Sequence, residues 1–214
     1  MNNNLHVLSV NVGNREKIDI GRKAAETGIF KQPVSGNIEI TDAGLSGDVV
    51  ANTEHHGGRD QAVYIYSAED YEWFSEMLQR PLAPGTFGEN LTFSSFGVSE
   101  LRIGDRFQIN DVLLEVTAGR IPCATLAARM DDPGFVKKFR QAKKPGVYTR
   151  VLNGGALKAG DAVKIIPDED HHPTVNEILE LVYSKERNTS MIESALKAPI
   201  AERARGLFQS WTTP

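Results

Sequence analysis

The sequence predicts a mainly β fold, in which short strands form a curled or closed sheet with helices at its periphery. Short apolar segments of strand-like composition fill most of the first two-thirds of the 214-residue chain, and glycines separate nearly all of them. Strands this short fit a closed sheet better than a doubly wound parallel sheet. After Pro167 the pattern changes to helical periodicity, which predicts a small C-terminal unit of three helices.

The expected strands carry different local signals. Residues 36–41 alternate apolar and polar side chains, and residues 61–66 are rich in β-branched and aromatic side chains. Asn110-Asp111 favours a hairpin turn between two further apolar segments. The full set of expected strands is 5–12, 36–41, 61–66, 106–109, 112–117, 148–152 and 162–166.

Two helices are expected between these strands. Ser67 can cap a helix that runs through Glu76 or beyond, because a serine side chain accepts a hydrogen bond from the first turn. Asp132-Pro133 can start a second helix, since proline suits a first helical turn. The apolar residues of both helices are expected to pack in the core.

The C-terminal region contains three helix-start signals. Thr174 and Ser190 each begin a capping box, and Pro199 suits the first turn of a third helix. We therefore expect a β domain of residues 1–167 and a helical domain of residues 168–214. Because so small a unit is marginal alone, we expect it to dock on the β domain or on a second subunit of a homodimer.

The net charge, the lengths of the apolar stretches and the cysteine count exclude some functions and indicate where the protein is located. The formal charge of −4 argues against binding to a nucleic-acid polymer, which needs a basic face. No stretch approaches the roughly 20 apolar residues of a membrane-spanning helix, and the first residues lack the pattern of a secretory signal. A single cysteine fits a reducing compartment. We expect a cytoplasmic protein with no membrane partner.

Cys123 is the only cysteine and the most informative residue. It cannot form an internal disulfide, so it is a small buried hydrophobe, a reactive thiol or a soft metal ligand. Pro122 places it next to an expected helix start, where backbone N–H groups stabilise a thiolate. Arg120 adds positive charge nearby. The local residues leave these readings open.

Two polar stretches with glycines are candidate binding loops. Glycine lets the backbone approach a ligand closely, and arginine suits a phosphate or a carboxylate. The adjacent histidines of the first stretch lack a recognisable zinc-ligand spacing. Ordinary polar turns are the competing interpretation. The first stretch is His55, His56, Gly57, Gly58, Arg59 and Asp60, and the second is residues 84–92, with Thr86, Phe87 and Asn90.

A basic cluster follows the second expected helix. It contains Arg140, Lys143 and Lys144, which a solvated surface would explain. Arg150 differs because it lies inside a strand pattern, and we expect it to point into the mouth of the barrel. Together with Arg59 and Arg120, it would neutralise an anionic ligand.

The order of these motifs resembles the MOSC domain family over residues 5–167. The tail resembles the three-helix extension of its bacterial YiiM-like branch. This resemblance implies a MOSC-type β-barrel with peripheral helices, which binds molybdopterin-type molybdenum cofactor and reduces N-hydroxylated compounds such as N-hydroxylaminopurines and amidoximes. The motifs are Gly-Leu-Ser-Gly-Asp (44–48), His-His-Gly-Gly-Arg-Asp-Gln-Ala-Val-Tyr (55–64), Gly-Thr-Phe-Gly-Glu-Asn-Leu (85–91), Ile-Gly-Asp (103–105) and Arg-Ile-Pro-Cys (120–123).

The resemblance assigns a role first to Cys123, which falls on the family's cysteine and would be the thiolate ligand of molybdenum. The other roles are inferred from side-chain chemistry and loop position: His55, His56 or Asp60 would assist proton delivery or shape the pocket. The remaining candidates would bind the cofactor or form the pocket wall: Gly57, Gly58, Arg59, Thr86, Phe87, Asn90, Arg120 and Arg150.

The reaction would also need an external source of electrons. The chain has no cysteine cluster for an iron–sulfur centre. An external flavin or iron–sulfur protein would therefore be the electron donor, and a small N-hydroxylated molecule the substrate. Two other functions stay open: a carrier that binds the cofactor without turnover, and a thiol enzyme that uses Cys123 with a histidine and no cofactor.

Overall fold

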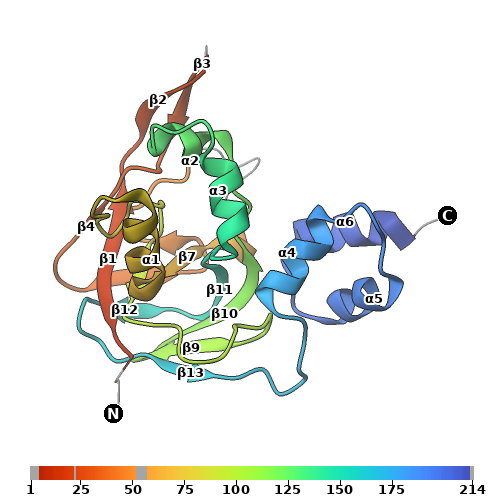
Figure 1. The fold of residues 1–214 in the computed structure, drawn as a ribbon. Coiled ribbons are helices and arrows are strands. Elements are labelled where there is room, and N and C mark those ends of the chain that lie inside the picture. Colours follow the sequence, from red (N-terminus) through yellow and green to blue (C-terminus); the bar gives the residue numbers. More distant parts are fainter. Residues whose placement is uncertain (1–4, 22, 52–56, 213–214) are drawn as a thin grey trace.

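One large sheet forms the frame of the fold (Figure 1). The computed structural model describes residues 5–21, 23–51 and 57–212. Eight strands among these residues pair in the order β13-β9-β10-β11-β7-β8-β1-β4, which confirms the predicted mainly β fold. Only β7 and β8 run parallel, and every other pair in this sheet is antiparallel. The bounds are β1 (Val7–Gly13), β4 (Lys31–Pro33), β7 (Val63–Ser67), β8 (Leu91–Phe93), β9 (Arg106–Ile109), β10 (Val112–Gly119), β11 (Val147–Asn153) and β13 (Lys164–Ile166).

The sheet curls but does not close into the expected barrel. Its edge strands β13 and β4 share no ladder among the described residues. The start of β1 instead meets the turn before β13 through the isolated bridge His6–Ala162. The backbone N–H of Val7 donates to the carbonyl of Asp161 at 2.9 Å, beside two further backbone bonds. Closure fails because this turn runs beside β1 for only a few residues, too short for a ladder.

Two smaller sheets complete the β structure. The first has the order β12-β5-β6, with β5 (Ile38–Thr41), β6 (Gly44–Leu45) and β12 (Gly155–Leu157). The second is the hairpin of β2 (Glu16–Ile20) and β3 (Lys23–Thr27), which projects from the body of the molecule (Figure 1).

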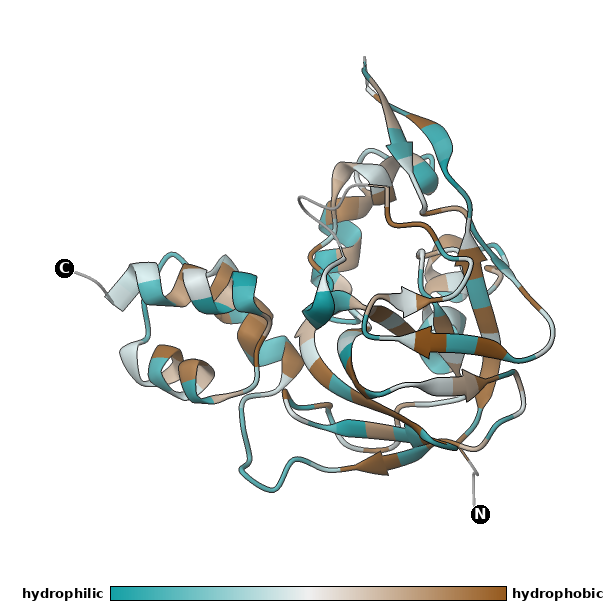
Figure 2. Cartoon of the chain, turned by 180° about the vertical axis from the view of Figure 1, so that it is seen from behind, coloured by the Kyte–Doolittle hydropathy of each residue, from teal (hydrophilic) through white to brown (hydrophobic). Residues whose placement is uncertain are grey.

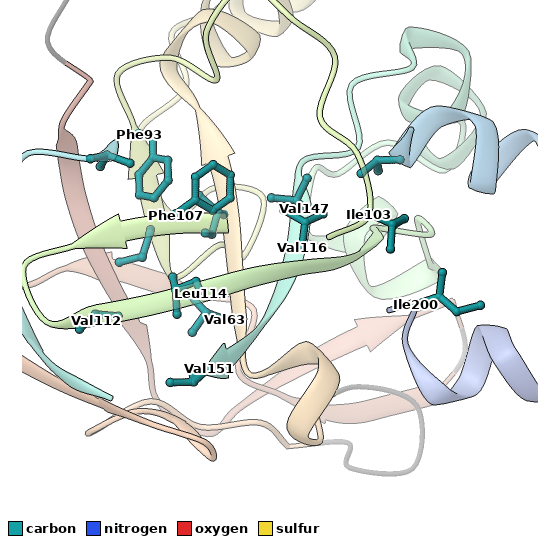
Figure 3. Close-up of a cluster of buried hydrophobic side chains, with 14 of the residues drawn as sticks. Val63, Phe93, Ile103, Phe107, Val112, Leu114, Val116, Val147, Val151 and Ile200 are labelled. Atoms are coloured by element: carbon teal, nitrogen blue, oxygen red, sulfur yellow. The ribbon is translucent and has the colours of Figure 1, made fainter. Parts of the chain in front are cut away.

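The core lies in two hydrophobic clusters on the two sides of the large sheet. One fills the curl of the sheet and includes Val63, Phe93, Phe107 and Leu114, all fully buried (Figure 3). The other is aromatic and packs the sheet against the helices α1 (Ala68–Leu78), α2 (Ala124–Arg129) and α3 (Phe135–Ala142). Figure 2 shows hydrophobic and hydrophilic positions interleaved along the strands, as expected for a sheet with differently covered faces.

Local signals start some of the helices where they were predicted, but not all of them. The helix α3 begins at Phe135 rather than at Asp132-Pro133, and the last helix begins at Glu202, so Pro199 lies before its first turn. The Ser67 side chain accepts a hydrogen bond from the backbone N–H of Asp70 at 3.1 Å at the start of α1. Thr174 and Glu177 form the predicted reciprocal capping box of α4 (Val175–Tyr183). The helix α5 (Thr189–Lys197) begins after Asn188 rather than Ser190, because the Asn188 side chain caps the Met191 N–H.

The C-terminal helices α4, α5 and α6 (Glu202–Thr212) lie at one side of the large sheet (Figure 1). Ile178, Ile192 and Phe208 belong to the same buried cluster as the sheet residues, so the unit packs on the β region, one of the two docking modes expected. The division between residues 167 and 168 and the homodimer stay predictions. In the described part of the chain, every helix is too short or too polar to cross a membrane.

Candidate functional site

The candidate site is a cavity of about 180 Å³ beneath the β2–β3 hairpin, at the start of α2. Its wall brings together residues that are far apart in the sequence. The segment between Ala51 and Gly57, both of which line the cavity, lies outside the described residues. The lining side chains that can do chemistry include Lys31, Asp48, Tyr64, Asn90, Arg120, Cys123 and Tyr148.

Cys123 occupies the N-cap position of α2 and is half-buried. Its backbone is extended, and its carbonyl accepts a hydrogen bond from the N–H of Ala127 at 3.2 Å. The sulfur therefore sits where a helix begins, and the positive end of the helix dipole favours negative charge there. This position suits a thiolate that faces the cavity.

Arg120 provides the buried cation of the site. The residue is buried, with only 6% of its surface exposed to solvent. Its Nη1 donates to the carbonyl of Phe87 at 2.6 Å, and its guanidinium carbon lies 5.1 Å from the centre of the Tyr64 ring. Tyr64 in turn stacks on Tyr148.

Two features make Arg120 suited to an anionic ligand. Desolvation acts to lower the pKa of Arg120, but its interactions with the neighbouring Tyr148, Tyr64 and Cys123 outweigh this effect and hold the pKa above the ordinary value, so the guanidinium stays charged. Its buried Nε has no hydrogen-bond partner among the described residues. An unsatisfied buried N–H is costly, so a ligand that accepts this hydrogen bond would be stabilised.

Lys31 and Asp48 form a buried ion pair that lines the same cavity. The Lys31 Nζ contacts both carboxylate oxygens of Asp48. Asp48 also accepts hydrogen bonds from the Gly13 N–H and from the Asn90 side-chain amide, both at 2.8 Å. Desolvation lowers the pKa of Lys31, and the negative charge of Asp48 opposes this shift only in part.

Four of the predicted site residues meet at this cavity: Gly57, Asn90, Arg120 and Cys123. Gly58, Arg59, Thr86 and Phe87 do not line it. Phe87 is fully buried in the aromatic cluster and reaches the site only through its carbonyl, and Thr86 bonds the Ala83 carbonyl. His55 and His56 lie outside the described residues.

Asp60 and Arg150 have structural partners away from the cavity. Arg150 does not point into a barrel mouth. Its Nη2 donates to the carbonyls of Pro199 and Ile200 and pairs with Asp60 at 3.0 Å. Asp60 also accepts a hydrogen bond from the Glu202 N–H at 2.8 Å. These contacts fasten the start of α6 to the sheet, so we leave both residues out of the proposed site.

Sequence reasoning missed Lys31, Tyr64 and Tyr148 as parts of the site. A lysine within the apolar stretch 29–34 is the one local signal that points to a buried, paired ammonium group. Its partner Asp48 lies in the Gly-Leu-Ser-Gly-Asp motif, but the pairing depends on tertiary structure.

Comparison with known proteins identifies the family. The MOSC domain family matches residues 52–164. The protein YflK of Bacillus subtilis is 32% identical over 203 residues, which cover 94% of this chain and 92% of YflK. A protein of Gibberella moniliformis named reductase is 26% identical over 200 residues, which cover 92% of this chain and 35% of that longer protein. The crystal structure of YiiM from Geobacillus stearothermophilus is similar with a TM-score of 0.79 and 25% identity, over 98% of this chain and 100% of that one.

The chain belongs to the MOSC domain family and to its YiiM-like branch, as the order of its motifs indicated. MOSC domains are a type of domain that binds molybdenum cofactor. The protein is therefore a MOSC protein associated with this cofactor.

Proposed function

We propose that this protein is a molybdenum-cofactor-dependent reductase of N-hydroxylated compounds, with Cys123 as the molybdenum ligand. The observation that carries the proposal is that Cys123 and the buried cation Arg120 line the same cavity. Membership of the MOSC family supports the cofactor, and the name of the Gibberella relative supports a reductive reaction.

The residues of the cavity fit the chemistry of this cofactor. A thiolate is a soft, strongly donating ligand for a transition metal, and Cys123 supplies the only one in the chain. The unpartnered Nε of Arg120 would donate to the phosphate or to the pterin edge, because a guanidinium matches planar and anionic acceptors. Asn90 would hold Asp48 in position rather than contact the metal.

When bound, the cofactor supplies the two-electron chemistry that converts an N–OH group to N–H with release of water. The balanced change, R–NHOH + 2e⁻ + 2H⁺ → R–NH₂ + H₂O, needs protons from the protein or solvent. Lys31 holds a proton on Nζ at the cavity wall, and desolvation lowers the pKa of this group, so it is a stronger acid than an exposed lysine. Electrons come from an external flavin or iron–sulfur protein.

The test is reduction of an N-hydroxylaminopurine and of an amidoxime by protein from a host that makes molybdenum cofactor. Reduced methyl viologen serves as the electron donor, and the wild type is compared with Cys123→Ser. We expect turnover by the wild type and loss of at least about a hundredfold in the variant, as for removal of a group that acts on the reacting centre.

The same assay separates the two competing functions. Bound cofactor without turnover would identify a carrier. Turnover without molybdenum that ends when Cys123 is alkylated would identify a thiol enzyme. Either result contradicts the proposed reductase.

A further inference from the structure

A second and larger cavity, of about 400 Å³, lies between α3 and α4 and is not used by the proposed reaction. This volume is within the range of about 300–1,000 Å³ that is usual for small-molecule sites. Figure 1 shows α3 against the β region on the side toward α4, which begins the helical unit. We call this cavity the α3–α4 cleft.

The α3–α4 cleft combines an apolar wall with a positive rim. Pro122, Phe139 and Leu179 are among its apolar lining residues, and flat rings pack well against such surfaces. Its charged lining side chains are Arg120, Arg140, Lys143, Lys144 and Glu180. The cleft is therefore strongly positive in a chain whose formal charge is −4.

Two of the positive groups, Arg140 and Lys143, are available to an anion, whereas Lys144 is already paired with Asp70 at 2.6 Å. Lys143 pairs with Glu180, but both side chains are more than half exposed, so this pair is weak and can rearrange. Arg140 lies 3.8 Å over the Tyr183 ring, which orients its guanidinium without neutralising it. An arginine held in this way presents its N–H groups to a phosphate.

The position of the cleft indicates what kind of molecule it takes. Pro122 lines the α3–α4 cleft, whereas Cys123 lines the smaller cavity, and Arg120 lines both. The segment 120–123 is thus a wall between them. A substrate must touch the reacting atoms beside Cys123, but an electron donor need only lie close, because electrons cross a thin protein wall without contact.

We propose that the α3–α4 cleft binds a flat heteroaromatic electron donor that carries a phosphate, namely reduced flavin mononucleotide. The ring system packs on the apolar wall, and the phosphate meets Arg140 and Lys143. This assignment rests on the proposed reductase function, and the external electron-donor protein then acts by supplying the reduced FMN. The balanced reaction is FMNH₂ + R–NHOH → FMN + R–NH₂ + H₂O, in which the flavin loses two electrons and two protons and the N–O bond breaks.

Binding is measured first, by titration of flavin fluorescence with the full chain. The matched variants are Arg140→Glu in the rim and Lys137→Glu, which makes the same charge change on α3 but outside the cleft. We expect Arg140→Glu to weaken FMN binding at least about tenfold and Lys137→Glu to change it less than about twofold. Lys143→Gln, at a well-exposed position, checks the result if Arg140→Glu folds poorly.

Riboflavin and AMP identify the part of the ligand that is recognised. Riboflavin lacks the phosphate and should bind the wild type at least about tenfold more weakly than FMN. Any one of three results would overturn the proposal. These are equal binding of riboflavin and FMN, equal losses of FMN binding in the Arg140 and Lys137 variants, and tighter binding of AMP than of FMN.

A second measurement separates this proposal from the proposed function. Anaerobic turnover with reduced FMN, divided by turnover with reduced methyl viologen, should fall in Arg140→Glu and not in Lys137→Glu. An unchanged ratio overturns the flavin site. If FMN binds as expected but neither donor supports turnover of an N-hydroxylated compound, the proposed reductase function fails instead.

Discussion

Arg150→Met removes the contacts that fasten the start of α6 to the sheet. In the wild type, the Arg150 guanidinium donates to the carbonyls of Pro199 and Ile200 at 2.9 and 3.3 Å. It also pairs with Asp60 at 3.0 Å and lies 3.7 Å from the buried Glu115. Methionine keeps the apolar stem but loses every one of these polar contacts.

The expected loss of stability can be bounded from these contacts. Breaking a buried ion pair by removing one partner costs about 3–5 kcal/mol, and a hydrogen bond to a charged group contributes about 1.5–3 kcal/mol. Arg150 and Asp60 are 22% and 24% exposed, and Arg106 still pairs with Glu115, so the lower end applies. We expect the free energy of unfolding to fall by about 3 kcal/mol.

Urea unfolding followed by circular dichroism measures this loss. Arg15→Met is the control, because the Arg15–Glu26 pair is more than half exposed and should contribute less than about 1 kcal/mol. Molybdenum content should not change at temperatures where Arg150→Met stays folded. The reasoning is wrong if Arg150→Met costs no more than Arg15→Met, or if molybdenum is lost while stability is kept.

Three further predictions concern stability. Glu89 accepts a hydrogen bond from the Tyr71 hydroxyl, and burial raises the pKa of the Glu89 carboxyl. The contribution of Glu89 to stability is therefore greatest below the ordinary pKa of a glutamate, and it is lost as the pH rises through the raised pKa. The stability of the wild type relative to Glu89→Gln should therefore decline from about pH 4.5 upward, by at most about 1.4 kcal/mol per pH unit in urea titrations. Thr174→Ala removes the cap of α4 and should cost about 1 kcal/mol by thermal unfolding, and no loss would contradict the capping role. Gly146→Ala should cost more than about 1 kcal/mol, because Gly146 has a φ of 61° and an added Cβ would lie 2.5 Å from Tyr66.

Local chemistry made part of the fold predictable. The hairpin of β9 and β10 and the capping box of α4 were predicted because each depends on a few adjacent residues. The β2–β3 hairpin was not predicted, since the Lys-Ala-Ala-Glu-Thr sequence of β3 has little strand character of its own. These residues form a strand because they pair with β2 in the folded chain, and the sequence of β3 alone does not reveal that pairing.

The site was predictable only where one residue carries the signal. Cys123 stands out because it is the only cysteine, and Arg120 because it is close in sequence. Arg150 was misplaced because the direction of a strand side chain depends on register, and the β10–β11 pairing shifts register twice. The Lys31–Asp48 pair joins β4 to a distant loop, which no local pattern reveals.

Molybdenum per chain, in protein from a cofactor-competent host, tests the central claim most directly. The wild type is measured beside Cys123→Ala and Arg120→Met, with circular dichroism to confirm that each variant folds. We expect near-stoichiometric molybdenum in the wild type, loss or altered coordination of the metal in Cys123→Ala, and weaker retention in Arg120→Met. A wild type without molybdenum or pterin, or a Cys123→Ala variant with the same content and the same metal spectrum, would contradict the account.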